Sequence, residues 1–215
     1  MGNNAVDWDA YTKDMGATGF PMDLLLRYSG NYVLDVGCGI GRHLVALGTK
    51  PLRVGVEISL GALKRAQVLS NEVLLVQADA YRLPFPSSFF DTVLSIDVIE
   101  HLEHPSDMLQ EIFRILQPHG RLILQTPNYP IKRFYDVINC MKPGSWRKTI
   151  RDDPTHVVKL SWWQLERLVS DFVIIESRTR NILLESKLPF LVRLKRYWIG
   201  KLLGQKTIIV AMKPG

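Results

Sequence analysis

Two acidic residues flank a glycine-rich loop near the start of the chain. The segment YVLDVGCGIGRHL places Asp35 two residues before Gly37, and Gly39 and Gly41 follow at alternate positions. Glycines at this spacing permit positive φ angles and let the backbone approach a ligand with no Cβ in the way. Glu57 ends the next apolar run, where a carboxylate can accept both hydroxyls of a ribose. The loop and the two acids therefore predict a site for a nucleotide-like ligand.

The spacing of the glycines distinguishes two classes of ligand. A dinucleotide site has the pattern G-x-G-x-x-G, in which the backbone approaches a pyrophosphate. This chain has G-x-G-x-G instead, with Asp35 just ahead of it. A carboxylate at that position repels a pyrophosphate but suits a ligand that carries an ammonium or sulfonium charge. A NAD(P)-dependent oxidoreductase is therefore the weaker alternative, although Glu57 alone fits both classes.

Alternating strand and helix patterns must position these groups. They predict a doubly wound α/β fold whose mostly parallel sheet is buried on both faces. We expect strands over 32–36, 53–58, 73–77, 92–96 and 121–125, and helices over 42–47, 60–69 and 106–116. Ser106 is the expected N-cap of the last helix, because Pro105 disfavours a helical residue before it.

The pattern changes at Pro127. The run Pro127-Asn128-Tyr129-Pro130 should not continue a central strand, since proline cannot donate to a sheet ladder. Beyond it we expect helices over 162–169 and 188–203, and strands over 172–177 and 207–212. We predict one domain, with 1–31 as a lid or packing strap, 32–128 as the cofactor-binding core, and 129–160 and 181–205 as acceptor-side insertions.

Five motifs occur in order along the chain: VLDVGCGIG, VEIS, QADAYRLPFPSSFFD, SIDVIEHLEHP and LQPHGRLILQTPN. Together they resemble the class I S-adenosylmethionine-dependent methyltransferases over about residues 32–128. The likeness is greatest to the small-molecule and lipid-type group that includes the quinone-biosynthesis O-methyltransferases. The resemblance implies S-adenosylmethionine as the cofactor and a seven-stranded, Rossmann-like sheet in which strand 7 lies antiparallel beside strand 5.

The resemblance also implies a role for each motif residue. At the methionine end of the cofactor it places Asp35, Gly37, Cys38, Gly39, Gly41 and Asp97. On the adenosine side, Glu57 would bind the ribose hydroxyls, while Ile58 and Leu83 would cover the two faces of the adenine. Asp79 would accept a hydrogen bond from the adenine amino group, and the Ala80 N–H would meet a ring nitrogen.

His156, in the sequence DPTH, is the first candidate for a general base. It follows the fifth strand in an insertion expected to cover the active site, where it could take a proton from a hydroxyl acceptor. A purely structural role in that insertion is the alternative. Methyl transfer from a sulfonium otherwise needs mainly the correct placement of a nucleophile.

Asp97, Glu100 and His101 form a second candidate set. Their spacing places them on one face of a helical turn, so Asp97 and His101 are further catalytic candidates. The spacing resembles the acid–acid–His set of metal-dependent quinone O-methyltransferases, but the same Glu-His pair is frequent in relatives that need no metal. We therefore predict no metal site and keep a divalent ion as the alternative. His43 and His119 are expected to do no chemistry.

Composition bounds the class of protein. The chain has 215 residues, of which 47% are hydrophobic and 22% charged, which is ordinary for one soluble domain. Its two cysteines form no disulfide framework, which fits a reducing compartment. We see neither a leader-like start nor an apolar run of about 20 residues, and so expect a cytoplasmic protein.

Charge is unevenly distributed along the chain. Residues 1–130 contain 10 Lys or Arg against 14 Asp or Glu, whereas residues 131–215 contain 17 against 7. The basic half could be a solvated face, could dock on an anionic membrane through 188–203, or could bind nucleic acid. Nucleic acid is least favoured, because residues 95–98 read Ser-Ile-Asp-Val where base methyltransferases have Asp-Pro-Pro-Tyr or Asn-Pro-Pro-Tyr.

The combined expectation is an S-adenosylmethionine-dependent methyltransferase that moves a methyl group to a small-molecule or lipid-like acceptor, at oxygen. Nucleic-acid or protein methylation and a non-catalytic, cofactor-binding adaptor are the alternatives. We expect a cytoplasmic protein, with peripheral contact to an anionic membrane as one option. The sequence leaves the acceptor and the oligomeric state open.

Overall fold

The computed structural model describes residues 7, 19–69, 71–129, 131–134, 153–180 and 204–215. In these residues the strands are β1 (Tyr32–Val36), β2 (Leu52–Glu57), β3 (Leu74–Gln77), β4 (Phe90–Ile96), β5 (Leu116–Pro127), β6 (Val173–Arg180) and β7 (Lys206–Met212). They form one sheet of order β3-β2-β1-β4-β5-β7-β6. Only β7 is antiparallel to its neighbours, β5 and β6. The predicted mostly parallel sheet with an inserted antiparallel strand is confirmed.

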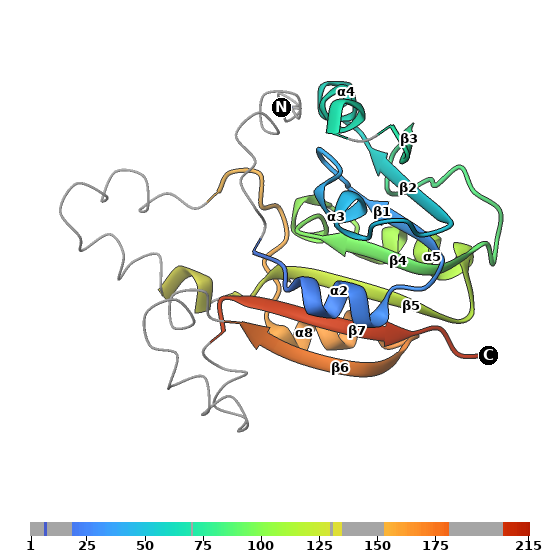
Figure 1. The fold of residues 1–215 in the computed structure, drawn as a ribbon. Helices are drawn as coiled ribbons and strands as arrows, with labels where there is room; N and C mark the ends of the chain where they lie inside the picture. The colour runs from blue at the N-terminus through green and yellow to red at the C-terminus, as the bar shows by residue number, and fades with distance from the viewer. Residues whose placement is uncertain (1–6, 8–18, 70, 130, 135–152, 181–203) are drawn as a thin grey trace.

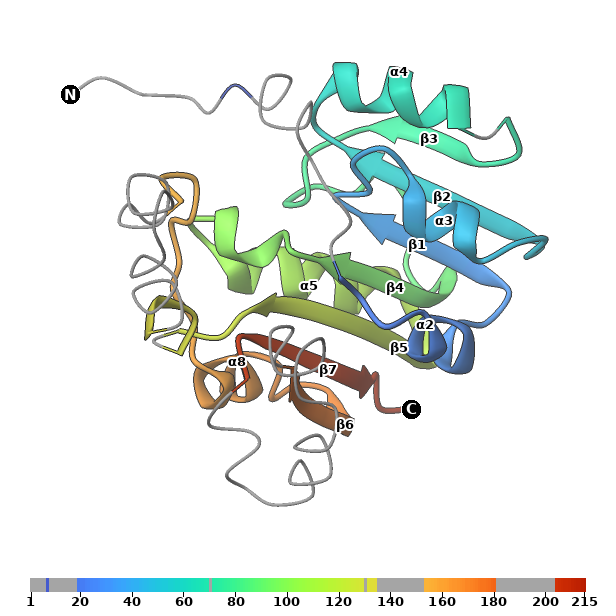
Figure 2. The ribbon, with the colours of Figure 1, turned by 60° about the vertical axis from the view of Figure 1, so that its left-hand side comes forward.

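Helices cover both faces of the sheet (Figure 1). The described helices are α2 (Met22–Tyr28), α3 (Arg42–Ala46), α4 (Leu60–Leu69), α5 (Pro105–Ile115) and α8 (Trp162–Leu168), with a 3-10 turn η2 (Ile99–His101). Apolar residues of α2, α3 and α4 pack on one face, and those of α5 and α8 on the other. Figure 2 shows the two helical layers on opposite sides of the strands.

The two faces follow from alternation along each strand. In β1, Val33 belongs to the core under α2 and α3, whereas Leu34 belongs to the core under α5. In β4, Val93 and Leu94 divide between the same two cores. Successive side chains of a strand point to opposite faces, so a strand covered on both sides is apolar at nearly every position.

The geometry of β7 determines which residues meet at the site. Because β7 is antiparallel to β5, its first residue lies beside the last residue of β5, and Lys206 pairs with Pro127. The carboxyl ends of β4 and β5 and the start of β7 therefore share one edge of the sheet, at the left in Figure 1. In open α/β sheets, this is the edge at which ligands bind.

Two local predictions are corrected by the structure. The helix α5 begins at Pro105 rather than after Ser106, with His104 as the N-cap residue. Proline is well suited to the first helical position, because the N–H that it lacks would have no partner there. The strand β5 also continues through Pro127, which pairs only with β7 because the register with β4 ends at Gln125. Because Pro127 has no partner on β4, its missing N–H removes no hydrogen bond with that strand.

Several sequence predictions lie partly or wholly outside the described residues. The described part of the N-terminal segment packs on the sheet through Phe20 and α2, whose Leu24 and Leu25 are fully buried. The choice between lid and strap for residues 1–31 stays a prediction. The expected helix over 188–203 lies outside the described residues. Among the described helices, none has the length and apolar character needed to cross a membrane.

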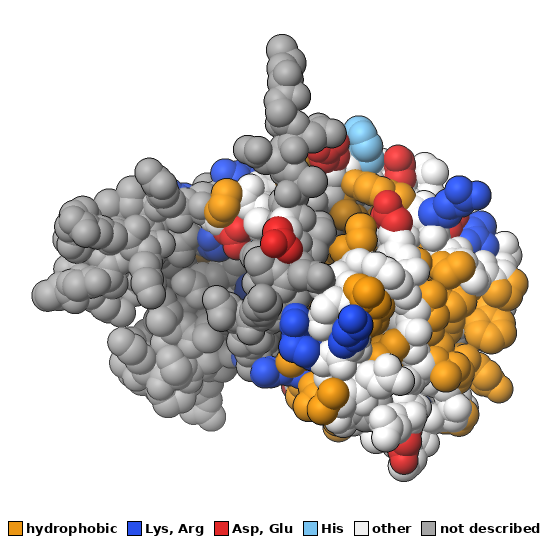
Figure 3. Space-filling model, turned by 90° about the horizontal axis from the view of Figure 1, so that it is seen from above, with side chains coloured by type: hydrophobic (Ala, Val, Ile, Leu, Met, Phe, Trp, Pro, Cys, Tyr) orange, Lys and Arg blue, Asp and Glu red, His pale blue; other side chains and the backbone are white. Residues whose placement is uncertain are grey.

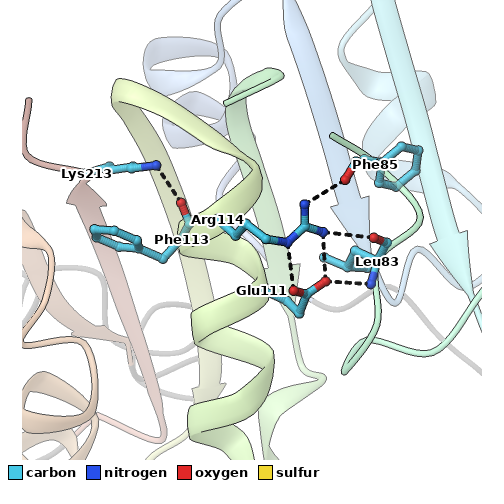
Figure 4. Close-up of polar contacts among 6 residues, drawn as sticks. All are labelled: Leu83, Phe85, Glu111, Phe113, Arg114 and Lys213. Atoms are coloured by element: carbon cyan, nitrogen blue, oxygen red, sulfur yellow. Dashed lines mark hydrogen bonds and ion pairs between the residues drawn. The ribbon is translucent and has the colours of Figure 1, made fainter. Parts of the chain in front are cut away.

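Arg114 ties the loop after β3 to α5 (Figure 4). Its guanidinium donates to the carbonyl oxygens of Leu83 and Phe85, at 3.0 and 2.8 Å, and pairs with Glu111. Glu111 in turn accepts from the Leu83 N–H at 2.9 Å. On the opposite side of the same end of α5, Lys213 donates to the Phe113 and Leu116 carbonyls. The loop that follows Asp79 is therefore held through one backbone N–H, which donates to Glu111, and through two backbone carbonyls, which accept from Arg114.

Replacement of Arg114 tests this anchor. We expect Arg114→Met to lower the free energy of unfolding by about 1–2 kcal/mol, or a few degrees in Tm, because two loop carbonyls lose a partly exposed donor. Limited proteolysis should then cleave within 81–89, whereas Arg167→Met on the exposed side of α8 should leave Tm and cleavage unchanged. Equal behaviour of the two variants would contradict the anchor.

Candidate cofactor and acceptor site

The glycine loop is a compact turn between β1 and α3. Gly37, Gly39 and Gly41 all have positive φ, at 72, 53 and 78°, which side chains rarely adopt. A Cβ at Gly37 would also meet a methyl carbon of Val98 at 2.4 Å. The loop therefore packs directly against the segment after β4, and it needs glycine both for its dihedral angles and for space.

Glu57 holds the loop in place. One carboxylate oxygen accepts from the Gly39 N–H and the other from the Ser59 N–H, both at 3.0 Å. Such backbone bonds to a carboxylate are among the stronger hydrogen bonds in proteins. Glu57 thus has a structural role that the sequence did not indicate, in addition to its predicted contact with a ribose.

Asp35 is a buried charge beneath the loop. Its side chain is 1% exposed, and neither carboxylate oxygen accepts a hydrogen bond within the described residues. His43 of α3 lies at ion-pair distance, with Nδ1 3.5 Å from Asp35 Oδ2. Burial alone lowers the pKa of His43, but Asp35, and then Asp97, more than offset this and raise it. The carboxylate therefore lies in a position that favours a nearby positive charge.

Cys38 completes the loop from below. The thiol is buried against β2, since a Cβ on Gly55 would lie 2.6 Å from its sulfur. Burial raises the pKa of this thiol well above its ordinary value, and the charges of Asp35 and Glu57 add to the effect. Cys38 is therefore a packing residue of the loop, and any contact with a cofactor would use its backbone.

The predicted adenosine-side residues lie at the ends of β2 and β3. Ile58 is 48% exposed directly after Glu57, so it presents an apolar surface beside the ribose position. Asp79 is exposed and accepts from the Tyr81 N–H, and Ala80 is half-buried. Leu83 is only 3% exposed in the core under α5, and its N–H and carbonyl are bound by Glu111 and Arg114, so its contact with the adenine stays a prediction.

These features fit S-adenosylmethionine. Within the described residues the buried Asp35 carboxylate has His43 as its one charged partner, at 3.5 Å, and so suits a cationic ligand group, and the glycine loop leaves room where a Cβ would not. An exposed apolar residue next to a carboxylate at the end of β2 suits an adenosine. Asp35, the loop and Glu57 would hold the cofactor, which would supply a methyl group on a positively charged sulfur.

Asp97 connects the cofactor side to the rest of the edge. It follows β4 with a positive φ of 57° and accepts from the Gln125 amide at 3.3 Å on each oxygen. Its closest partner is Lys206, the first residue of β7, with Nζ 2.7 Å from Oδ1. Long-range pairing of β5 with β7 brings this lysine to the site.

Glu100 is a buried acid next to this ion pair. It is 2% exposed and accepts a hydrogen bond from the Thr126 hydroxyl at 2.9 Å. Burial, followed by the charge of Asp97, raises the pKa of Glu100 to about 8. The carboxyl of Glu100 is therefore largely protonated at neutral pH.

His101 and His156 lie together with Tyr129. The two imidazole rings are 5.0 Å apart, and His156 Nδ1 is 2.7 Å from the Tyr129 hydroxyl. His101 Nδ1 donates to the Thr155 carbonyl at 3.0 Å, which assigns the proton to that nitrogen and the lone pair to Nε2. Burial lowers the pKa of His101 and favours its neutral form. The site thus holds a neutral imidazole that can accept a proton.

The described residues contain one group of metal-capable side chains at this edge. Glu100, His101 and His156 each place a ligand atom within 4.8 Å of the others. Oxygen and imidazole donors would suit several divalent ions. His156 occupies the place that the sequence had assigned to Asp97, because Asp97 is engaged by Lys206.

Several site residues were not predicted from the sequence. His43 was expected to do no chemistry, yet it is the ion-pair partner of Asp35. Tyr129 and Lys206 join the site through the return of β7 and the contact with residues 153–160. A signal existed for Lys206, since it begins a strand expected to lie antiparallel to the fifth.

One face of the described residues shows no single basic patch. In Figure 3, Lys and Arg side chains form small groups among acidic and hydrophobic ones, and no patch of one sign dominates the described part of this view. The segment proposed for membrane docking, 188–203, lies outside the described residues. Membrane contact stays a prediction.

Replacement of Glu100 tests its protonation. Between pH 4.5 and about 8 the folded state keeps a proton that the unfolded state releases, so stability falls as pH rises through this range. Glu100→Gln should therefore increase the free energy of unfolding relative to the wild type, and with it Tm, by an amount that grows from pH 5 to 9 and reaches at most about 5 kcal/mol. The exposed neighbour provides the control Glu103→Gln, which should show no such trend. A constant difference across the pH series would contradict the raised pKa.

A family model described as a methyltransferase domain matches residues 34–124. The matched segment begins within β1 and ends within β5. It therefore contains the glycine loop, Glu57, Asp79 and Asp97, but not Tyr129, His156 or Lys206.

Two curated relatives show the range of chemistry among similar proteins. The tRNA U34 carboxymethyltransferase of Hydrogenovibrio crunogenus is 34% identical over 112 residues, which are 47% of this chain and 34% of that protein. The ubiquinone/menaquinone biosynthesis C-methyltransferase UbiE of Pseudomonas fluorescens is 33% identical over 115 residues, which are 49% of this chain and 45% of that protein. The chain thus spans only about a third to a half of these relatives.

A solved structure reproduces the whole fold. The S-adenosylmethionine-dependent methyltransferase from Mesorhizobium loti matches with a TM-score of 0.65 and 17% identity, covering 92% of this chain and 99% of that one. At this identity the likeness shows the fold alone. The domain match, the two relatives and the strand order confirm the resemblance seen in the motifs. Residues 34–124 thus match a methyltransferase domain, and the chain is similar in motifs and fold to the class I S-adenosylmethionine-dependent methyltransferases.

Proposed function

We propose that the chain transfers a methyl group from S-adenosylmethionine to an oxygen atom of a small-molecule or lipid-like acceptor. One observation carries the proposal: a cation-favouring carboxylate and a neutral histidine meet at the same edge of the sheet. Asp35 and the glycine loop provide the first, and His101 beyond β4 provides the second. The first suits a sulfonium cofactor and the second suits removal of a proton from a hydroxyl group.

His101 is the more suitable base of the two histidines. Its Nδ1 proton is held by the Thr155 carbonyl, so Nε2 can accept a proton. The lowered pKa keeps the ring neutral before the reaction. His156 was the first candidate from the sequence, but its two nitrogens face Tyr129 and Asp153, at 2.7 and 3.8 Å.

His156 is then proposed to orient the acceptor side. Asp153 is held by the Thr155 hydroxyl and N–H, which lower the pKa of its carboxyl although burial opposes them. A charged Asp153 beside Nε2 favours a proton on that nitrogen, so Nδ1 accepts from the Tyr129 hydroxyl. This chain of contacts fixes the direction of the Tyr129 hydroxyl next to the base.

A nucleic-acid acceptor is the second candidate. The relative that acts on tRNA and the excess of Lys and Arg after residue 130 favour it. Against it, Ser95 and Asp97 occupy the positions where base methyltransferases have a proline-containing motif. Methyl uptake from labelled cofactor into tRNA, compared with phenols, quinol precursors and lipids, distinguishes the two classes of acceptor.

Cofactor binding tests the first half of the proposal. Isothermal titration should show binding of S-adenosylhomocysteine and none of NAD. Asp35→Asn should weaken binding about tenfold or more. It should not lower the Tm of the free protein, because it removes a buried charge whose oxygens accept no hydrogen bond within the described residues. The exposed control Asp171→Asn should bind normally. Unchanged affinity in Asp35→Asn, or no binding by the wild type, would sink the proposal.

Turnover on an accepted substrate tests the second half. His101→Gln should lower kcat by about a hundredfold or more with the KM for the cofactor unchanged, since a general base contributes on that scale. Tyr129→Phe should cost only about tenfold, because it alters orientation alone. In the wild type, kcat should rise with pH and level off below the pH expected of an ordinary histidine. Full loss of activity in EDTA, restored by Mg²⁺, would assign Glu100, His101 and His156 to a metal instead.

A further inference from the structure

Lys206 lies where the cofactor is expected to place its own positive charge. Its Nζ is 2.7 Å from Asp97 Oδ1, and both side chains are largely buried, with 21 and 16% exposed. The motif resemblance assigns Asp97 to the methionine amino group. Two ammonium groups would then compete for one carboxylate that also binds Gln125. Binding of the cofactor must weaken the ion pair with Lys206.

The displaced lysine has few other anions within the described site. Glu100 is buried and is already bound by the Thr126 hydroxyl. Asp153 is already bound by Thr155 and faces His156. Two further lysines, Lys132 and Lys159, lie over the Tyr129 ring at 5.4 and 5.8 Å and add positive charge to this side.

A buried ammonium group without an anion is costly, so the site with cofactor bound favours an anionic partner. Lys206 lies beside the end of β5, and its side chain reaches Asp97 after β4, so its ammonium group lies at the carboxyl edge of the sheet. An acceptor that occupies this space would meet the lysine and the proposed base together.

We propose that Lys206 is an acceptor-binding residue, which the cofactor releases from Asp97 and which then binds an anionic oxygen of the acceptor. This inference rests on the proposed function and names the class of its substrate. The anionic oxygen is either a carboxylate carried by the acceptor or the ionised hydroxyl that receives the methyl group. In the second case the lysine favours loss of the hydroxyl proton to the base.

Two probes of the protein saturated with S-adenosylhomocysteine separate these sources. Calorimetry compares 3,4-dihydroxybenzoate with its uncharged counterpart 3,4-dihydroxybenzamide, which differ in the carboxylate. The visible spectrum of 4-nitrocatechol, which distinguishes the phenol from the phenolate, reports whether the bound hydroxyl is ionised. The variants are Lys206→Met, which removes the charge, Lys206→Arg, which keeps it, and Lys64→Met, which removes an exposed charge on α4.

We expect the wild type to bind the benzoate about tenfold or more tightly than the benzamide, or to ionise bound 4-nitrocatechol at a lower pH than in solution. Lys206→Met should lose that preference, Lys206→Arg should keep most of it, and Lys64→Met should match the wild type. Lys206→Met should also bind S-adenosylhomocysteine several-fold more tightly, because Asp97 loses its internal competitor. That gain tests the competition for Asp97, and the loss of the preference for the anionic probe tests the acceptor role.

The possible failures are distinguishable. In one outcome, the wild type binds S-adenosylhomocysteine but neither prefers the benzoate nor ionises 4-nitrocatechol at a lower pH. The same outcome includes the case in which no probe binds. It overturns the role of Lys206, and the proposed function stands. The role of Lys206 is also overturned if Lys206→Met still prefers the benzoate to the benzamide. If the wild type does not bind S-adenosylhomocysteine, both this inference and the proposed function fail.

Discussion

The burial of the Asp35 carboxylate is the constraint on which the rest of the site depends. A charged group without hydrogen-bond donors in the interior costs several kcal/mol unless a partner compensates for it. His43 provides a partner at 3.5 Å, and neighbouring strands on both sides hold Asp35 in register with Gly55 and Leu94. The fold thus supplies the stability that keeps a buried carboxylate with a single, distant partner in place among the described residues. A cationic ligand recovers part of that cost when it binds.

Much of the fold follows from local patterns. The strand over 32–36 and the helix over 60–69 have the predicted bounds, because apolar runs and helical periodicity are properties of a few consecutive residues. The start of α5 was wrong by one residue, since the restriction that proline imposes falls on His104 and not on Pro105 itself. The extent of β5 was wrong because pairing with a distant strand, rather than local sequence, decides where a strand ends.

The site was predictable only where it lies within the matched motifs. The glycine loop, Asp35 and Glu57 are close in sequence, and their chemistry is visible in their spacing. Lys206 is far from Asp97 in sequence, and only the antiparallel return of β7 brings the two together. His43 was dismissed because an isolated histidine in a helix carries no sign of a buried partner. Sequence thus identifies the predicted cofactor residues, and tertiary pairing places Lys206 beside Asp97.

The position of β7 between β5 and β6 also governs the order of assembly. Until residues 206–212 are available, β5 has an open edge and β6 has no strand to pair with. The buried side chains of α2 pack in a core that includes Ile208 and Val210, so this helix cannot settle before β7 either. During synthesis the edge of β5 therefore stays unpaired until β7 has been made, and an unpaired strand edge can pair with other chains. Aggregation of nascent or truncated chains, rather than loss of the cofactor loop, is the expected weakness of this topology.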